Sequence, residues 1–534
     1  MKRMSDEKLQ SRTLQQASTL IARGDHRAAH DLCLVALQRE EAPAQALFLL
    51  ALIAADHQNP AKALQLTDRA LSFSGEHTGA RAQRARALLA LHRQAEARAE
   101  AEATAALDPR EGHVLDTLGV VLSRTGAYHA AAALFRKAVA RRPDHAGWQY
   151  NLASALQFTG DLEGARRAYE AALAIAPDHH RALSSLVALS RQTGADNRIA
   201  ALESLFDDAD PDPARQQHLG HALAKSFEDM GDYPTALAWL IRAKAGRRRT
   251  LGYTVARDRA LFEAAAHTAA RPALKGCDDA APIFIVGLPR TGTTLLDRVL
   301  SSHPDIVSAG ELGDFSLLVK RMTGTPSPMV LDVETFEAAE RLDFAALGRA
   351  YVERARATVE DGAGASAARV IDKMPLNVLN AGLIHRALPN ARIVCLRRHP
   401  VDSALSNYRQ LFATDFPYYD YAFDLGDAGR YYALFDRLVG HWRDTLASDR
   451  FTEVAYEDLV ADLEGQTRRL LDFVGLPFDP ACLSFQDNKA AVSTASSVQV
   501  RSPLYSTSIG RWKRYGDGLK PLIDALREEG VAVN

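Results

Sequence analysis

The sequence lacks the features that mark secreted and membrane-spanning proteins. Its four cysteines are scattered over 534 residues with no close pair, which argues against a disulfide framework or a cysteine-rich zinc site and indicates a reducing compartment. The apolar run from Ala281 to Leu288 is far shorter than the ~20 residues that span a bilayer. The N-terminal MKRMSDEKLQ lacks the apolar stretch of a signal peptide. We therefore expect a cytoplasmic protein without a membrane span.

An excess of charge of one sign is also missing. Lys plus Arg number 64 and Asp plus Glu number 66, which leaves a formal charge of −2. A protein that wraps nucleic acid needs excess positive charge, so we expect no nucleic-acid partner, and we interpret Arg247–Arg249 as a solvent-facing helix end. The composition, 47% hydrophobic and 24% charged, is typical of globular proteins. The length predicts two or three domains of about 150 residues each.

The N-terminal half repeats itself with a period of 34 residues. Alanine recurs at this interval, and a small residue follows seven positions later in each unit. The two series are Ala29, Ala63, Ala97, Ala131, Ala165 and Ala36, Ala70, Thr104, Ala138, Ala172. Glycines precede the first series at Gly24, Gly126 and Gly160, and prolines close three units at Pro109, Pro143 and Pro177. Small residues let two helices approach closely, glycine permits the turn between them, and proline ends the second helix.

One unit, residues 118–143, resembles the tetratricopeptide repeat. The matching positions are Leu118, Gly119, Gly126, Tyr128, Ala131, Phe135, Ala138 and Pro143. A further unit is predicted around Leu223, Phe227, Gly231, Tyr233, Ala236 and Ala243. The resemblance implies an all-α superhelix over residues 1–245 with a concave surface, followed by a linker with connecting helices over 246–280. The array would bind a peptide or partner protein, or act as a spacer or dimerisation arm; the sequence leaves these alternatives open.

The pattern changes after residue 280 to short β-branched runs separated by helical segments. The runs are IFIV (283–286), DIVS (305–308), RVID (369–372), RIVCL (392–396) and FTEV (451–454). Strands that alternate with helices predict a doubly wound α/β domain with a parallel sheet over 281–534. Ligands sit at the carboxyl ends of such strands, and here those ends carry GLPRTGTT, Glu311, Lys373, Arg398 and Tyr456.

The first strand leads into a predicted phosphate-binding loop at the start of a helix. Its candidate binding residues are Gly287, Pro289, Arg290, Thr291, Gly292, Thr293 and Thr294. The two glycines allow close backbone approach, and the helix N-terminus favours an anion. The spacing is that of a P-loop, but Thr293 stands where the lysine is expected. That lysine reaches the β- and γ-phosphates of a triphosphate, so its absence argues for a shorter 5′-phosphorylated donor.

A second motif, RRHPVDSALSNY (397–408), places Arg398 and Ser406 eight residues apart. Together with the loop it resembles the donor site of sulfotransferases that use 3′-phosphoadenosine 5′-phosphosulfate. The resemblance covers roughly 282–515 and implies that the loop holds the 5′-phosphosulfate, while Arg398 and Ser406 hold the 3′-phosphate. A metal is not expected, because fixed cations and N–H groups can neutralise the donor.

Further positions resemble the protein-tyrosine sulfotransferase branch of that family. The resemblance implies that Glu311 is the general base, that Lys373 lies near the transferred group, and that Ser496 is a catalytic serine. Arg290, Lys373 and Ser496 would stabilise negative charge during transfer. Tyr456 would contact the nucleotide, and Arg501, in a segment that returns over it, would lie near the 3′-phosphate. The small-molecule branch uses a histidine where this chain reads KMP, so the base of that branch cannot be carried over to this chain. His399 precedes a proline, and we expect it to cap or pack.

The sequence leaves the acceptor and two rival functions open. The repeats and the resemblance favour a protein or peptide tyrosine, but carbohydrate, lipid or small phenolic hydroxyls fit the same donor chemistry. Tyr418, Tyr419 and Tyr421 either line the acceptor entrance or belong to the core or surface. The rivals are a P-loop nucleotide kinase and a non-catalytic repeat scaffold with a degenerate nucleotide fold.

Overall fold

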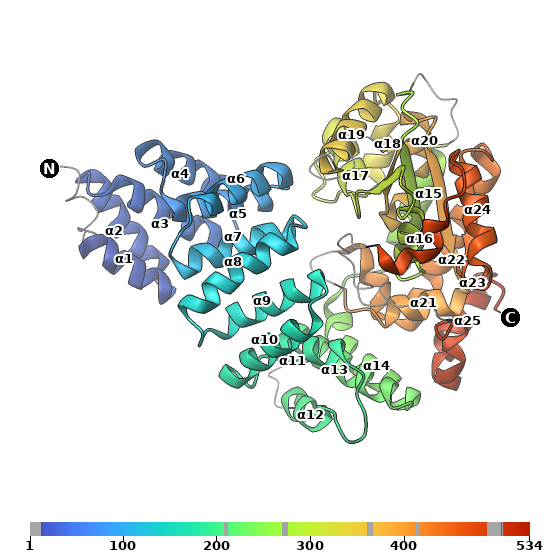
Figure 1. The fold of residues 1–534 in the computed structure, drawn as a ribbon, viewed down its shortest axis with the longest axis horizontal. Coiled ribbons are helices and arrows are strands. Elements are labelled where there is room, and N and C mark those ends of the chain that lie inside the picture. The colour runs from blue at the N-terminus through green and yellow to red at the C-terminus, as the bar shows by residue number, and fades with distance from the viewer. Residues whose placement is uncertain are drawn as a thin grey trace. The chain divides into compact units, whose positions relative to one another are not determined.

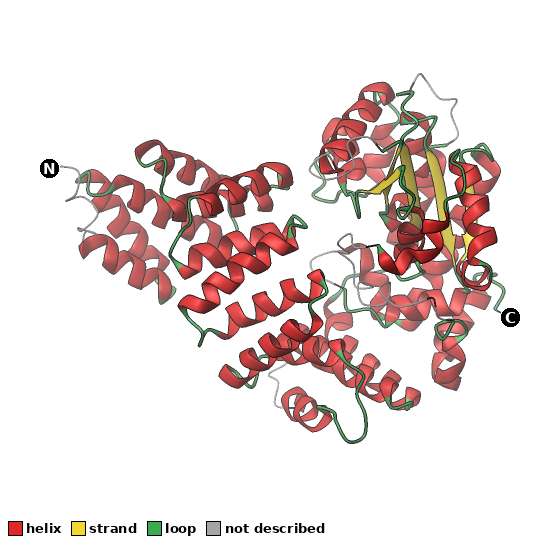
Figure 2. Ribbon diagram, viewed as in Figure 1, coloured by secondary structure: helices red, strands yellow, loops and turns green. Residues whose placement is uncertain are grey.

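The computed structural model describes residues 12–207, 212–269, 276–359, 367–412, 417–488, 504 and 506–533. The chain forms two compact units, which meet in the sequence between Leu189 and Ser190. Figures 1 and 2 show a unit built of helices followed by one that contains a sheet. The expected all-α array followed by an α/β domain is therefore confirmed. Among the described residues, no helix is both long and apolar enough to cross a membrane.

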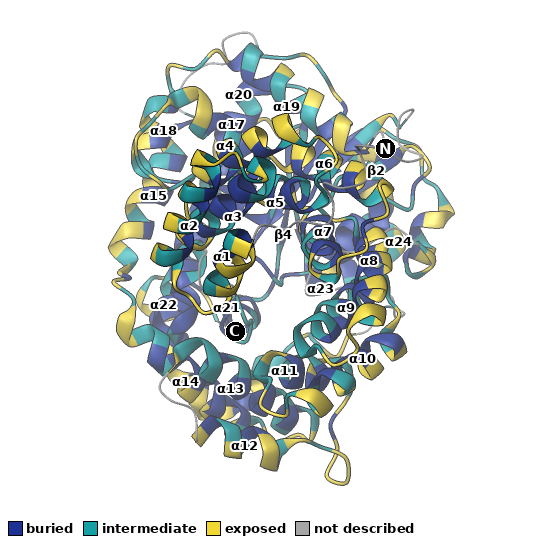
Figure 3. Cartoon of the chain, turned by 90° about the vertical axis from the view of Figure 1, so that its left-hand side faces the viewer, coloured by how far each residue is buried: buried dark blue, intermediate teal, exposed yellow. Residues whose placement is uncertain are grey.

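The first unit is a series of antiparallel helical hairpins. Its helices are α1 (Arg12–Ala22), α2 (His26–Gln38), α3 (Pro43–Asp56), α4 (Pro60–Phe73), α5 (Thr78–Ala90), α6 (Gln94–Ala106), α7 (Gly112–Arg124), α8 (Tyr128–Arg141), α9 (Ala146–Thr159), α10 (Leu162–Ile175) and α11 (His180–Leu189). All ten small residues of the 34-residue pattern are at most 1% exposed. They lie on the second helix of each hairpin, so the period marks helix–helix contact. Figure 3 shows the buried and exposed sides of these helices.

The turn inside each hairpin requires a left-handed backbone conformation. Residues 24, 58, 92, 126 and 160 have φ values of +79°, +55°, +58°, +83° and +88°. Three of these positions are glycine, as predicted, but the other two are Gln58 and His92. A residue with a side chain is strained at positive φ. The two units that lack the glycine therefore keep the geometry of the turn at a cost in folding free energy.

The second unit begins with a helical region that includes the last predicted hairpin. Its helices are α12 (Ile199–Asp207), α13 (Pro213–Asp229), α14 (Tyr233–Thr250) and α15 (Val255–His267). Gly231 makes the expected turn between α13 and α14 with a φ of +88°. This hairpin, which carries the repeat pattern, belongs to the same compact unit as the sheet.

The sheet has five parallel strands in the order β2-β3-β1-β4-β5. The strands are β1 (Pro282–Gly287), β2 (Ile306–Ser308), β3 (Arg369–Asp372), β4 (Arg392–Arg397) and β5 (Phe451–Ala455). Each contains or overlaps one of the five predicted runs, so the parallel sheet is confirmed. Side chains of β1 alternate between two cores: Ile283 and Ile285 pack with α16 and α24, while Phe284 faces the rings of α17 and α19.

Helices cover both faces of the sheet, as Figure 1 shows for α17 and α19 on one side and α24 on the other. The remaining elements are α16 (Thr293–Leu300), α17 (Asp314–Thr323), α18 (Val333–Ala339), α19 (Phe344–Val359), η1 (Pro375–Val378), α20 (Ala381–Ala387), α21 (Pro400–Tyr408), η2 (Pro417–Phe423), α22 (Leu425–Thr445), α23 (Tyr456–Ala461), α24 (Leu463–Val474), η3 (Pro480–Asp487), η5 (Arg511–Leu519) and α25 (Lys520–Glu528). The carboxyl ends of β1, β4 and β5 lead into α16, α21 and α23, and those of β2 and β3 lead into the segments that carry Glu311 and Lys373.

Candidate active site

The loop between β1 and α16 fits closely against its neighbours. A Cβ at Gly287 would lie 2.6 Å from the Leu396 carbonyl oxygen, and one at Gly292 would lie 2.5 Å from Cδ2 of Tyr456. Both glycines have positive φ, and Arg290 between them also adopts a φ of +64°. Gly292 is the N-cap of α16, so the first amides of the helix, at Thr293 and Thr294, lie at the positive end of its dipole. The loop can thus receive an anion at this helix end.

Buried hydrogen bonds hold the loop in this shape. The Thr291 hydroxyl donates to the Leu288 carbonyl at 2.7 Å, and Asn407 Nδ2 donates to the Pro289 carbonyl at 2.8 Å. Asn407 in turn accepts a hydrogen bond from the Tyr421 hydroxyl at 2.8 Å. Sequence reasoning missed Asn407, although it follows Ser406 in the quoted motif.

Arg398 lies beside the loop, after β4. It is 8% exposed, its guanidinium stands 4.9 Å from the centre of the Tyr456 ring, and it donates to the Arg290 carbonyl at 3.5 Å. The structure thus brings together Arg290, Gly292, Arg398 and Tyr456. Ser406 is half-buried on α21, the helix that begins just after Arg398.

At Arg398, and at Trp512 whose ring stacks on His399, one nitrogen donor each has no hydrogen-bond partner within the described part of the chain. These donors are Nε of Arg398 and Nε1 of Trp512, both buried. Buried donors are rarely left unsatisfied, so these atoms suit a site that receives an anionic ligand such as a phosphorylated nucleotide. His399 stacks on Trp512 with ring centres 5.5 Å apart, which agrees with the expected packing role.

Part of the C-terminal segment lies against Arg398 and Tyr456. Arg398 donates to the Ser508 carbonyl, and the Tyr456 and Ser508 hydroxyls are 2.9 Å apart. Asp402, on α21, accepts from the amides of Gly510 at 2.7 Å and Trp512 at 3.0 Å. Sequence reasoning missed both Asp402 and Ser508. The predicted site residues Ser496 and Arg501 lie outside the described residues.

The Lys373 ammonium donates to Oε1 of Glu311, so the candidate base and the candidate cation form an ion pair. Lys373 follows β3 and is almost fully buried, whereas the Glu311 side chain is 39% exposed. The Lys373 amide also donates to the Gly310 carbonyl at 2.8 Å, which fixes the two backbone segments side by side. A partly exposed carboxylate next to a buried cation is an arrangement suited to proton removal beside a developing negative charge.

Two buried carboxyl groups surround this pair, and sequence reasoning missed both. Burial raises the pKa of Asp372 to about 7, against the opposing effect of hydrogen bonds that include one from the Tyr351 hydroxyl at 2.7 Å. Asp372 also accepts from the Leu312 amide at 3.3 Å, which ties the Glu311 loop to the end of β3. Burial likewise raises the pKa of Asp297 on α16, although the Lys373 charge acts in the opposite direction.

The three tyrosines of η2 have different surroundings. Tyr421 is fully buried and stacks on Tyr431 with ring centres 3.6 Å apart, so it belongs to the core. The Tyr418 hydroxyl accepts from the amides of residues 330 and 331 at 2.8 Å. Tyr419 stacks on Phe412 at 4.1 Å, and the negative charge of Glu311 adds to the burial that raises its pKa. Of the three, Tyr419 is coupled electrostatically to the candidate base.

Comparison with known proteins gives two matches to family models. Residues 282–480 match the sulfotransferase family, and residues 123–189 match a tetratricopeptide repeat. The chain carries a sulfotransferase-family domain and tetratricopeptide repeats. Within the described residues, no group of three or more His, Cys, Asp or Glu side chains could hold a metal ion.

Relatives of this chain are distant in sequence. It is 30% identical to an uncharacterized protein of Aquifex aeolicus over 408 residues, which cover 74% of this chain and 52% of that protein. It is 25% identical to protein-tyrosine sulfotransferase A of Caenorhabditis elegans over 245 residues, 43% of this chain and 60% of that protein. The chain thus spans little more than half the length of these curated relatives. A solved sulfotransferase domain from the Synechococcus PCC 7002 olefin synthase has 20% identity and a TM-score of 0.34, and the match covers 49% of this chain and 98% of that domain.

Proposed function

We propose that this protein transfers a sulfuryl group from 3′-phosphoadenosine 5′-phosphosulfate to an acceptor hydroxyl. The observation that carries the proposal is the presence, at one sheet edge, of three features: a glycine loop on a helix N-terminus, a buried arginine whose Nε has no partner among the described residues, and a lysine–carboxylate pair. The match to the sulfotransferase family over 282–480 supports it. The absence of a P-loop lysine at Thr293 disfavours the kinase alternative.

In this proposal the donor is held at both phosphate-bearing ends. The loop from Gly287 to Thr294, including Pro289 and Thr291, binds the 5′-phosphosulfate through helix amides, hydroxyls and the Arg290 charge. Arg398 and Ser406, with Arg501, bind the 3′-phosphate, because a guanidinium fork suits a phosphate monoester. Tyr456 contacts the nucleotide.

Glu311 removes the proton of the acceptor hydroxyl. As it does so, the acceptor oxygen forms a bond to sulfur, and the bond between sulfur and the 5′-phosphate oxygen breaks, which leaves adenosine 3′,5′-bisphosphate. Lys373, Arg290 and Ser496 stabilise the charge on the sulfuryl and leaving oxygens. Because Lys373 is bonded to Glu311 in the structure, we infer that its ammonium turns toward the sulfuryl group during transfer and releases the carboxylate to act as base.

We further propose a protein or peptide tyrosine as the acceptor. Tyr419, stacked on Phe412 and electrostatically coupled to Glu311, supports an aromatic environment near the base. The relative in Caenorhabditis elegans bears the name of a protein-tyrosine sulfotransferase, and the repeats supply a surface of the kind that binds peptides or proteins.

The test is transfer of label from the labelled donor to paired peptides that carry tyrosine or phenylalanine at one position. We expect label on the tyrosine peptide only, and Glu311→Gln to reduce the rate by about 100-fold or more without loss of donor binding. Glu334→Gln, a change at an exposed glutamate on α18, is the matched control. Label in a carbohydrate or lipid fraction instead would contradict the acceptor, and no transfer to any acceptor would contradict the activity.

A further inference from the structure

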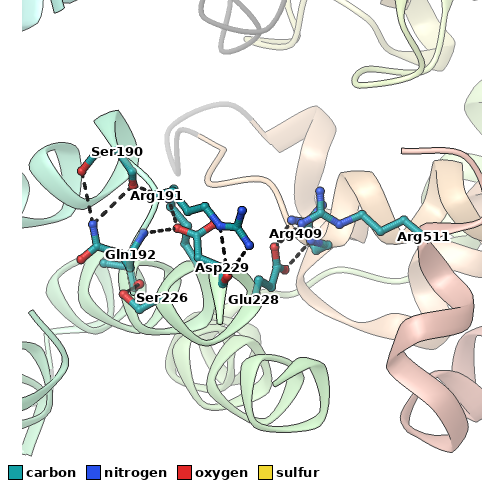
Figure 4. Close-up of polar contacts among 10 residues, drawn as sticks. Ser190, Arg191, Gln192, Ser226, Glu228, Asp229, Arg409 and Arg511 are labelled. Carbon is teal, nitrogen blue, oxygen red and sulfur yellow. Dashed lines mark hydrogen bonds and ion pairs between the residues drawn. The ribbon is translucent and has the colours of Figure 1, made fainter. Parts of the chain in front are cut away.

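A buried carboxylate on the repeat-like hairpin contacts the C-terminal end of α21 and the helix η5. Glu228, near the end of α13, is 7% exposed. It accepts hydrogen bonds from Arg409 Nε at 2.6 Å, from Arg511 at 2.7 Å, and from the Tyr515 hydroxyl. Figure 4 shows both guanidinium groups directed at this side chain. One carboxylate thus joins three segments that are far apart in the sequence.

Two segments lie next to Arg398: the helix α21 and the segment that contains Ser508. The arginine partners of Glu228 come shortly after these segments in the sequence. Arg409 is the C-cap of α21, three residues after Ser406, and Arg511 begins η5, three residues after Ser508. Arg398 bonds to the Ser508 carbonyl at the other end of this arrangement. Both segments are therefore fixed near Arg398 and again at Glu228.

The cluster is built from charged groups. Burial alone would raise the pKa of Glu228, but the charges of Arg409 and Arg511 and the hydrogen bonds hold that pKa below its ordinary value. Arg409 is bound through two nitrogens, a geometry that fixes a guanidinium in direction as well as in distance. Removing one partner of such a buried group leaves the others uncompensated, so the neighbouring segments must shift.

We propose that Glu228 is a positioning residue for the donor site: it holds α21 and the Ser508–Tyr515 segment in the geometry that binds the 3′-phosphate side of the nucleotide. The inference rests on the proposed function. In this proposal the α13–α14 hairpin, which carries the repeat pattern, contributes to donor binding by the second unit. If Glu228 acted only through its negative charge, its removal would strengthen the binding of the anionic nucleotide, which is the opposite of the effect expected from positioning.

The next residue along α13 supplies a matched control. Asp229 accepts from the Gln192 amide at 2.9 Å and from Lys225, and it faces the chain segment at Ser190–Gln192 instead of Arg409 and Arg511 (Figure 4). A change there removes a hydrogen-bonded carboxylate from the same helix turn, and its two partners, Gln192 and Lys225, belong to neither α21 nor η5. Asp229→Asn therefore separates loss of helix stability from loss of donor positioning.

The experiment is calorimetric binding of adenosine 3′,5′-bisphosphate to the full chain and to Glu228→Gln, Arg511→Met and Asp229→Asn. We expect the first two variants to weaken binding by about 3- to 30-fold and Asp229→Asn to leave it unchanged. In transfer assays, the KM for the donor should rise in the same proportion, with kcat at saturating donor and the KM for the acceptor unchanged. The Glu228→Gln/Arg511→Met double variant should lose less than the sum of the two, because both act through one contact.

The outcomes separate the two proposals. If the unaltered chain does not bind the bisphosphate, the donor assignment fails and this inference fails with it. If the unaltered chain binds and Glu228→Gln binds equally well or more tightly, only the positioning role is overturned. If Glu228→Gln does not fold, Arg511→Met decides, since that side chain is 30% exposed and its removal leaves the Glu228–Arg409 bond in place.

Discussion

Two hairpins of this chain share a sequence pattern but differ in what they bury. The α7–α8 hairpin, like the rest of the first unit, packs small and apolar residues such as Ala131 and Phe135. Among the described residues of that unit, the buried polar side chains are all uncharged. The α13–α14 hairpin instead buries Glu228 and Lys244, at 7% and 1% exposed. The pattern specifies the hairpin, whereas the packing partner decides whether its buried face carries charge.

Lys244 illustrates what the second environment does to a charged group. Its ammonium donates to the Gln410 carbonyl at 3.3 Å and lies over the rings of Tyr408 and Phe423. Burial lowers the pKa of this lysine to about 7. The hairpin thus meets α21 and η2, the elements next to the candidate site, through polar and aromatic contacts.

The largest expected effect is on the transfer rate and not on the stability of the second unit. Arg290→Ala should reduce the transfer rate by about 100- to 1,000-fold, because it removes a fixed cation beside the transferred group. The melting temperature should change little, since the backbone of the loop is held by Thr291 and Asn407. Steady-state kinetics and thermal unfolding on the same preparation check this. Near-normal turnover in Arg290→Ala would contradict the assignment of Arg290 to the active site.

The next effect tests whether the 34-residue period marks contact. Ala131→Leu should destabilise the first unit by about 1–3 kcal/mol, because the side chain is fully buried and cannot accept added volume. Ala130→Leu, at the exposed neighbouring position, should lie within about 0.5 kcal/mol of the unaltered protein. Thermal unfolding of both variants measures the difference. Equal stability of the two would contradict the assignment of the buried face.

Asp372 provides a pH test in the second unit. The folded pKa of about 7 lies above the value in an unfolded chain, about 3.9, so the folded state holds this proton more tightly. The stability that this proton contributes is complete below about pH 4 and is lost as the pH rises toward and through 7. Asp372→Asn should flatten that part of the melting-temperature profile. Asp343→Asn, at an exposed helix cap, should not, and a parallel loss of slope in both variants would contradict the account.

The smallest effect concerns the hairpin turns. Gly126→Ala should destabilise the first unit by about 1 kcal/mol, because a Cβ there meets no neighbour and only the positive φ opposes it. Gln58→Gly should stabilise by a similar or smaller amount, since it removes the same strain from the equivalent turn. Denaturant unfolding resolves both signs. A stabilising Gly126→Ala would contradict the role of left-handed backbone in the repeat.

The elements most open to prediction were those with local periodicity. The hairpins and the five strands follow from spacings within about 34 residues, and parallel pairing explains why Glu311 and Lys373 meet at one edge. Residues with distant partners could not be found in this way. Glu228 contacts positions 181 and 283 residues away, and no local pattern distinguishes it from the exposed acids of other helices.

Buried polar residues at the site escaped prediction for a related reason. Asp372, Asp402 and Asn407 act on backbone groups of neighbouring loops, and nothing in their immediate sequence says that they face inward. Each lies within two residues of a predicted strand end or inside a quoted motif, which is the signal that could have found them. The roles given to Ser496 and Arg501 stay predictions.

The most direct test of the central claim compares three nucleotides in calorimetry on the full chain: adenosine 3′,5′-bisphosphate, adenosine 5′-monophosphate and ATP with magnesium. The account predicts the tightest binding for the bisphosphate, about tenfold or more weaker binding when the 3′-phosphate is missing, and loss of that difference in Arg398→Met. Equal affinity for the bisphosphate and the monophosphate, or a preference for ATP with magnesium, would contradict it.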